Sequence, residues 1–333
     1  MPAGHSGDIP GWTSQTSLMF LAALSLLILA AAWLLVRVSA LRRFADAPPQ
    51  THAPAADEEL QLDALCARAG PTADRAMLRR FLRARGELEP ALAGYRECVE
   101  WRAANNVDRY GGLRRIRGAL GAEARILAQL RMVRPREHEA LWLYGGQTFL
   151  HGHDRQGRPI FLQRTGLASH RFAELYAFFG GGAAGQKAYI DGYVFGQEVQ
   201  AARAALTGAT QQVVVMDLAG LSLSPDPRAL TTFREFLRIS QLYYPETLAL
   251  HFFVNAPIAF AGLWRVVRGW LDPATASKFH VLGRGESRAS LLEHIAPDQL
   301  PREYGGTSDV ELPRDREGCA RMVEEAKYQL RNL

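Results

Sequence analysis

Four short runs rich in β-branched and aromatic residues alternate with helical segments in the second half of the chain. They cover residues 158–163, 212–218, 248–254 and 278–282. Strands that alternate with helices predict a mostly parallel sheet covered by helices. The stretch 213–216 (VVVM) is apolar at every position, as expected for a strand buried on both faces. We therefore predict an α/β fold, with its sheet between residues 141 and 308.

A long uncharged segment lies near the N-terminus. No charged residue occurs from Ile9 to Val36, and 18–36 is almost wholly apolar. A helix of that length, rising about 1.5 Å per residue, spans roughly the hydrocarbon core of a bilayer. Arginines follow the segment and none precedes it, which places the rest of the chain in the cytosol. We expect a transmembrane anchor; a cleaved signal peptide and a buried core helix are the alternatives.

The expected organisation therefore has seven parts. An extracytosolic tail (1–17) precedes the anchor (18–38), and a Pro/Ala-rich linker (39–57) follows it. A helical region (58–105) comes next, in which apolar side chains at 77, 78, 81 and 82 share one face between a cap at Thr72 and a stop at Gly86. An arginine-rich segment (106–140) joins this region to the sheet domain (141–308). A helical tail (309–333) ends the chain.

One helix, 258–272, has an unusually regular apolar stripe. Its apolar side chains recur at spacings of three and four, and Arg265 and Arg268 lie off the stripe. An ordinary helix packed on the sheet would have this pattern. Tryptophans beside arginines are also typical of a helix that rests at a lipid interface, which favours a movable lid. The stripe consists of Phe260, Leu263, Trp264, Val267, Trp270 and Leu271.

The composition argues against several other classes of protein. The net charge is +5 and almost all of the positive charge is arginine, which suits contact with anionic phosphates. The arginine-rich segment has almost no interleaved aromatic residues, so we expect no nucleic-acid binding. The cysteines at 66, 98 and 319 show no C-x-x-C spacing, which argues against a disulfide framework or a zinc site.

The chain also lacks enzyme signatures. No G-x-S-x-G motif is present, which argues against a common lipase. The cluster His151, His153 and Asp154 has no further metal ligands at suitable spacing, so a polar turn explains it better. Asp217 ends a buried strand and has no glycine-rich loop beside it, which favours a structural role. The loop 180–185 (GGGAAG) lacks the lysine and hydroxyl of a phosphate-binding loop, and we expect a flexible connection there.

Four motifs make the chain resemble the CRAL-TRIO lipid-binding proteins, and more closely their phosphatidylinositol-transfer branch. These motifs are FLRARGELEPALAGYRECVEWR at 81–102, DRQGRPIFLQRTG at 154–166, YYPETLALHFFVNAPIAFAGLWRVVRGWLDPATASKFHVLG at 243–283, and LPREYGGT at 300–307. The resemblance implies a hydrophobic pocket that holds one lipid, floored by the sheet and closed by the helix 258–272. It covers about residues 60–308.

The resemblance also implies a headgroup site. Matched position by position, the residues for an inositol phosphate headgroup are Arg85, Glu246, Thr275 and Lys278. A basic residue often follows the arginine in the family, whereas here Gly86 does. The positions that bind phosphatidylcholine in dual-specificity members carry hydroxyls; here they match Phe161, Gln212 and Val214, which argues against a phosphatidylcholine site.

Together these features predict a membrane-tethered lipid carrier, with no catalytic residue, metal or cofactor. The expected ligand is phosphatidylinositol, and the expected partners are a membrane surface and a lipid kinase or other protein. The expected localisation is a single-pass membrane protein whose soluble domain faces the cytosol. The alternatives are a carrier of a sterol, tocopherol or retinoid, and a membrane-bound adaptor.

Overall fold

A computed structural model describes residues 55–110, 148–222, 226–309 and residue 317, all within one compact unit, 49–333. The predicted anchor at 18–38, its flanking tail and most of the linker lie outside the described residues. So do most of the arginine-rich segment and nearly all of the predicted C-terminal tail. Among the helices that are described, none is both long and apolar enough to cross a bilayer.

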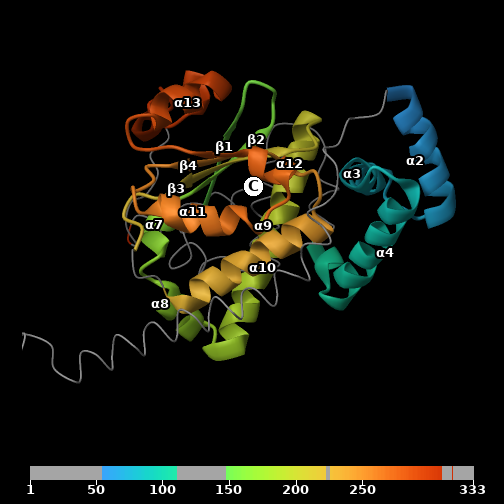
Figure 1. Cartoon of the computed structure of the whole chain (residues 1–333), viewed down its shortest axis with the longest axis horizontal. Helices are drawn as coiled ribbons and strands as arrows, with labels where there is room; N and C mark the ends of the chain where they lie inside the picture. The colour runs from blue at the N-terminus through green and yellow to red at the C-terminus, as the bar shows by residue number, and fades with distance from the viewer. Residues whose placement is uncertain (1–54, 111–147, 223–225, 310–316, 318–333) are drawn as a thin grey trace, which may run out of the picture. The chain divides into compact units, whose positions relative to one another are not determined.

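The described part of the chain forms a five-stranded sheet in the order β1-β2-β3-β4-β5 (Figure 1). Strand β1 pairs antiparallel with β2, and the other three pairings are parallel, which confirms the predicted fold class. All four predicted strands are present, and β1 was missed. The bounds are β1 Thr148–His153, β2 Pro159–Gln163, β3 Gln212–Asp217, β4 Leu248–Val254 and β5 Phe279–Val281.

Helices flank the sheet, and the helices that precede it in the chain form a separate group. The N-terminal group is α2 (Ala55–Ala69), α3 (Arg75–Arg85), α4 (Leu88–Ala104) and η1 (Val107–Tyr110). The sheet domain contains α7 (Thr165–Ala168), α8 (Phe172–Phe178), α9 (Gly182–Thr207), α10 (Pro227–Tyr243), α11 (Phe260–Arg268), α12 (Pro273–Ser277), α13 (Ser287–His294), η3 (Pro297–Gln299) and η4 (Arg302–Tyr304).

The ends of α3 show how local chemistry sets its length. Asp74 caps the helix, because its side chain accepts a hydrogen bond from the Met77 amide at 2.9 Å. Thr72, the predicted cap, lies outside the helix. Gly86 ends the helix in the left-handed conformation (φ 74°), as predicted. The predicted apolar face of α3 is buried, whereas Val99 of α4 is 44% exposed.

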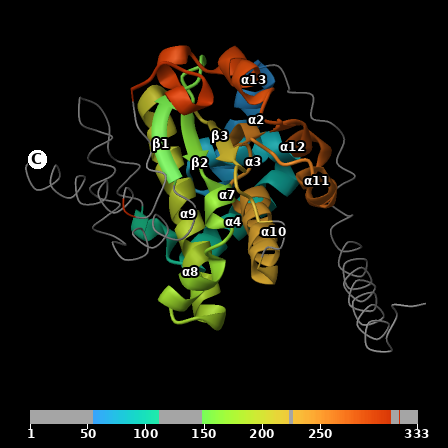
Figure 2. The same ribbon diagram turned by 90° about the vertical axis from the view of Figure 1, so that its left-hand side faces the viewer.

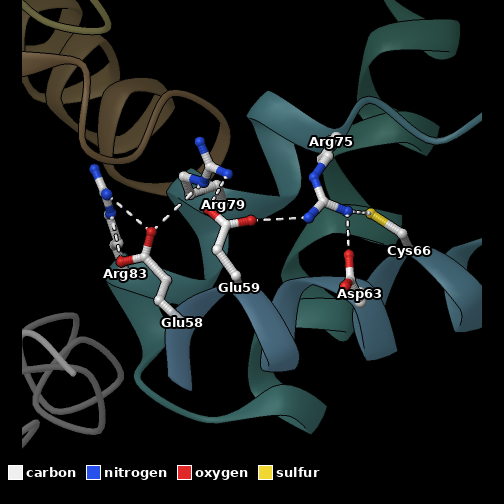
Figure 3. Close-up of polar contacts among 7 residues, drawn as sticks. All are labelled: Glu58, Glu59, Asp63, Cys66, Arg75, Arg79 and Arg83. Carbon is white, nitrogen blue, oxygen red and sulfur yellow. Dashed lines mark hydrogen bonds and ion pairs between the residues drawn. The ribbon is translucent and has the colours of Figure 1, made fainter. Parts of the chain in front are cut away.

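Acidic side chains of α2 meet basic side chains of α3 in a ladder of ion pairs (Figure 3). Glu59 bridges Arg75 at 2.9 Å and Arg79 at 2.5 Å, and Glu58 accepts from Arg83 at 2.8 Å. Exposed pairs of this kind add little stability each. Leu62 and Leu65 of α2 are fully buried beneath them, so apolar packing holds α2 in place and the charges set its orientation.

A buried ion pair connects the helical group to the sheet domain. The guanidinium of Arg102 in α4 donates to both carboxylate oxygens of Glu198 in α9, at 2.8 and 3.2 Å. The hydroxyl of Tyr244 donates to the same carboxylate at 2.9 Å. Burial lowers the pKa of Arg102, but the hydrogen bonds and charge of Glu198 outweigh this and raise it. Both side chains therefore stay charged in a dry interior.

The two faces of the sheet pack differently, and we name them by the helix that covers each. The α13 face packs against α13, η3 and η4, with α13 lying on one side of the sheet and α9, α10 and α11 on the other (Figure 1). Its polar group, Asp217, accepts from Tyr304, Asn255 and the Ala219 amide, each at 2.9 Å, which confirms a structural role. The strand residues of the α13 face are Ile160, Leu162, Val213, Val215, Phe252 and Val254.

The glycine-rich loop 180–185 is a tight junction between α8 and α9, and the prediction of a flexible connection was wrong. Gly180, Gly181 and Gly182 all have positive φ angles (94°, 73° and 49°), which most side chains avoid. A Cβ at Gly185 would lie 2.6 Å from the carbonyl oxygen of Tyr176. The glycines therefore reverse the chain and let α8 pack closely on the start of α9 (Figure 2).

Candidate functional site

The second face of the sheet, the α11 face, carries a row of neighbouring side chains across four strands. The register pairs Phe161 with Val214, Val214 with His251, and His251 with Phe279. Residues two positions apart on a strand point to the same side, so Gln212 also belongs to this face. Helix α9 crosses the row, because a Cβ at Gly196 would lie 3.8 Å from the ring of Phe161.

Helix α11 covers the β4–β5 end of this face. The rings of Phe260 and Trp264 lie 5.1 and 5.4 Å from Phe253, and Trp264 lies 5.2 Å from Phe279. In the predicted stripe, Phe260, Val267 and Leu271 are buried, and the other three are half-buried. Ile258 and Val266 on the outer side are 98% and 42% exposed.

The helix is shorter than the predicted 258–272. Phe260 is the first helical residue, because Ile258 and Ala259 form a turn, and α11 ends at Arg268. Asp272 then caps α12 by accepting from the Thr275 amide at 2.8 Å. Trp270 lies in the short turn between the two helices.

Two residues of α10 hold that turn, and no sequence pattern singled them out. The side chain of Gln241 donates to the carbonyl oxygen of Trp270 at 3.3 Å. The guanidinium of Arg234 lies 5.6 Å from the centre of the Trp270 ring, within the range of a cation–π contact. The far end of α11 is therefore joined to α10 by weak polar contacts.

Two of the four expected headgroup residues meet. The ammonium of Lys278 donates to the carboxylate of Glu246 at 3.2 Å, and both side chains are about one-fifth exposed. Glu246 precedes β4 with a positive φ of 55°, an uncommon conformation for a residue other than glycine. Thr275 lies one turn before Lys278, whose amide donates to the Thr275 carbonyl at 3.1 Å. Half-buried and partly water-accessible, the pair could receive a polar ligand.

Arg85 occupies a different position. It is the last residue of α3, and its Nε lies over Gly94 of α4, 3.6 Å from where a Cβ would stand. Within the described residues, no hydrogen bond or ion pair joins it to Glu246, Thr275 or Lys278. The neighbouring Arg83 is close enough to Glu246 for the charge of that carboxylate to raise the pKa of the arginine, after the larger effect of its hydrogen bond to Glu58.

Buried polar atoms on the α11 face have no partner in the described part of the chain. They are the Nε2 of His251 and the Oε1 of Gln212. Desolvation lowers the pKa of His251 to about 3, so its ring is neutral at pH 7. Sequence reasoning named Gln212 but missed His251; its only signal was a polar residue inside an apolar strand pattern, LALHFFV. The described residues contain no cluster suited to a metal ion.

Comparison with known proteins identifies the architecture. Residues 143–306 match the model of the CRAL/TRIO domain family. This part of the chain is therefore similar to a CRAL/TRIO domain. The solved structure titled "Crystal structure of Sfh5" superposes with a TM-score of 0.52, covering 84% of this chain and all of that one. Its sequence is only 14% identical, so this likeness concerns the fold alone.

The CRAL/TRIO relatives include several proteins named Sec14. The SEC14 cytosolic factor of Eremothecium gossypii is 28% identical over 71% of this chain and 70% of its own length. The Sec14 cytosolic factor of Schizosaccharomyces pombe is 29% identical over 70% of this chain and 74% of its own. The phosphatidylinositol/phosphatidylcholine transfer protein SFH9 of Arabidopsis thaliana is 29% identical over 68% of this chain and 36% of its own.

These relatives correct one prediction. We expected a single-pass membrane protein, but the yeast relatives are named cytosolic factors. The predicted localisation was therefore wrong. It depended on the apolar run 18–36 and on the arginines that follow it.

Proposed function

We propose that this protein binds one phosphatidylinositol molecule between the α11 face of the sheet and its covering helices, and transfers it between membranes. The observation that carries the proposal is the adjacency of two unlike surfaces. The Lys278–Glu246 pair is half-buried, and the aromatic row of the α11 face begins at the next residue, Phe279. A lipid with a charged headgroup and apolar chains matches that order.

The polar end suits an inositol phosphate. The ammonium of Lys278 attracts the phosphodiester, and the carboxylate of Glu246 accepts hydrogen bonds from inositol hydroxyls. Thr275 adds a hydroxyl one turn away, and Arg85 adds positive charge from α3. When the headgroup binds, it takes over part of the interaction that Lys278 and Glu246 make with each other.

The apolar end suits acyl chains, whose burial is favourable by about 0.8 kcal/mol per methylene. Release of the acyl chains into water would lose this free energy, so exchange takes place at a membrane. Phe161 and Val214 on this face offer no hydroxyl to a choline phosphate, and we infer a preference for phosphatidylinositol over phosphatidylcholine. No step in this function makes or breaks a covalent bond, so the protein is a carrier and not an enzyme.

The first test is lipid extraction and mass spectrometry of the purified protein, followed by transfer of labelled phosphatidylinositol between vesicles. We expect stoichiometric lipid, and faster transfer of phosphatidylinositol than of phosphatidylcholine. The variant Lys278→Ala should lose about ten- to a hundredfold in phosphatidylinositol transfer, since a hydrogen bond to a charged group contributes about 1.5–3 kcal/mol.

The matched control is Lys187→Ala. Lys187 pairs with Asp191 at 2.8 Å on the surface of α9, and it is 67% exposed. This variant removes the same charge without touching the Lys278–Glu246 pair, and it should transfer as the natural protein does. Purified protein without lipid, or an equal loss in both lysine variants, would contradict the proposed function.

A further inference from the structure

The inference begins with His251, whose side chain is buried at the centre of the α11 face. Only 8% of its surface is exposed, and the Nε2 atom is out of reach of water. Within the described residues no group shares a hydrogen bond with that atom. A buried polar atom without a partner is unfavourable, so natural proteins keep few of them. A ligand atom could provide the missing partner.

Its surroundings determine which kind of ligand group could pair with it. The imidazole stacks on Phe279 at 4.6 Å and lies 4.6 Å from Phe253, so its neighbours are rings rather than charges. The ring is neutral, because burial lowers its pKa far below 7. A neutral imidazole exchanges one hydrogen bond with an uncharged oxygen, and it offers no positive charge to a phosphate.

A second buried atom lies on the same face. The side-chain amide of Gln212 is buried, and its Nε2 donates to Gln197 of α9 at 3.1 Å. Its Oε1 has no partner among the described residues. Gln212 is two positions before Val214, which is the register partner of His251. The face thus presents two unpaired hydrogen-bonding atoms, one of which, Oε1, is an acceptor.

The position of His251 relative to the headgroup pair is fixed by the backbone. Its amide donates to the carbonyl oxygen of Lys278 at 2.8 Å, so the two residues are adjacent across β4 and β5. A phospholipid whose phosphate lies at the Lys278 ammonium has its glycerol ester groups a few bonds away. Those esters are uncharged oxygens, and they follow the phosphate toward the apolar chains.

We infer that His251 forms a neutral polar subsite in which its Nε2–H donates to an uncharged oxygen of the bound lipid. The inference rests on the proposed function and adds a specificity-determining contact to it. The oxygen can belong to an ester of a glycerophospholipid or to the hydroxyl of a sterol. Oε1 of Gln212 is an acceptor, so of these two oxygens only that of the sterol hydroxyl could donate to it.

The test compares two lipids that differ only in the ester carbonyl. Vesicles of phosphatidylcholine carry a small fraction of either diacyl phosphatidylinositol or its dialkyl ether analogue, and binding is measured for each. For the natural protein, the diacyl lipid should bind about three- to tenfold more tightly, as one net hydrogen bond contributes. In His251→Phe that advantage should disappear, with binding of the ether lipid unchanged.

Two variants make the result specific. His280→Phe makes the same substitution on the next strand, on the α13 face, where His280 stacks on Phe252. It should keep the full preference for the diacyl lipid. His251→Gln restores a hydrogen-bonding side chain and should keep part of the preference. An equal loss for both lipids in His251→Phe would overturn the inference, because it would show a change in packing alone.

A sterol arm separates the two sources of the oxygen. Cholesterol and its analogue without the 3-hydroxyl are compared in the same variants. A hydroxyl-dependent loss in His251→Phe, without any effect of the ester in phosphatidylinositol, assigns the subsite to a sterol-like ligand. Failure of every variant and of the natural protein to bind phosphatidylinositol refutes the proposed function, and the sterol arm still tests His251. No dependence on ester or hydroxyl in any arm refutes the subsite.

Discussion

The two faces of the central sheet are built from the same five strands but differ in how completely they are filled. On the α13 face the six strand residues of the apolar cluster are almost fully buried, and the Asp217 carboxylate receives donors at both oxygens. On the α11 face Phe161 and Phe279 are half-buried, and His251 and Gln212 keep unpaired atoms within the described residues. The difference supports the proposal that the α11 face contacts a ligand.

The largest expected effect is a loss of stability when a side chain of the α13 face is removed. Phe252→Ala removes a ring that is 0% exposed on the α13 face, and it should lower the free energy of unfolding by about 3–5 kcal/mol. Phe161→Ala, on the other face of the same sheet, should cost much less because its ring is already half-buried. Denaturant unfolding of both variants measures the contrast. Equal losses would show that the faces do not differ.

The next effect concerns the polar group of the packed face. Tyr304→Phe removes the hydroxyl that donates to Asp217 at 2.9 Å and that also hydrogen-bonds with Arg164. The loss should be about 1.5–3 kcal/mol in unfolding free energy, because the acceptor is a charged group. Lipid binding should be unaffected once the variant is folded. A variant as stable as the natural protein would show that Asp217 is satisfied without this donor.

A third effect is a loss of stability in acid, which distinguishes the two faces. The folded-state pKa of His251 is lowered to about 3 by burial, whereas the unfolded residue titrates near its ordinary value of 6.5. Protons therefore favour the unfolded state, and the stability present above pH 6.5 is lost as the pH falls toward 3. Between pH 7 and pH 5 this residue should account for a loss of about 2 kcal/mol.

The variant His251→Phe should abolish that part of the pH dependence. Thermal or denaturant unfolding at pH 7 and pH 5 gives the slope for both proteins. His280→Phe is a suitable control, since His280 lies on the α13 face and its pKa is lowered less, by its own burial and then by the charge of His294. An unchanged slope in His251→Phe would mean that the ring accepts a proton while folded.

The smallest effect concerns the cover of the α11 face. Arg234→Gln removes the cation–π contact with Trp270, which is worth about 0.5–1 kcal/mol at a partly exposed site. Lipid exchange between vesicles should become about two- to fivefold faster if the cover opens more readily. Arg238→Gln, on the same helix, removes a similar contact to Tyr243 instead and should leave the exchange rate unchanged.

Much of the sheet domain followed from the sequence. Apolar runs such as VVVM and the strand–helix alternation predicted four strands and their parallel arrangement. A continuous apolar run is the pattern expected of a strand that is buried on both faces. The missed strand β1 (TFLHGH) carries two histidines and a glycine, and its pairing with β2 is decided by the turn at Asp154. Gly157, at φ 75°, closes that turn.

The candidate site was less accessible to sequence reasoning. The Lys278–Glu246 pair joins residues that the family motif contains, so the resemblance could nominate both. His251 and Arg234 were not nominated, because their importance depends on which face of a strand or helix meets which neighbour. That information comes from strand register and helix packing, and a single sequence does not contain it explicitly. The prediction for the loop 180–185 failed for a related reason. Its glycines allow a close contact between α8 and α9, which composition does not reveal.

The buried Arg102–Glu198 pair has a practical consequence for the limits of the autonomous unit. The family match begins at residue 143, yet α4 supplies the guanidinium that neutralises Glu198 in the heart of α9. A fragment that starts at that boundary would keep the buried carboxylate of Glu198 without its counter-ion. It would also lay bare the apolar side of α9 and α10 that the N-terminal helices cover. A fragment that keeps this ion pair must therefore include α4.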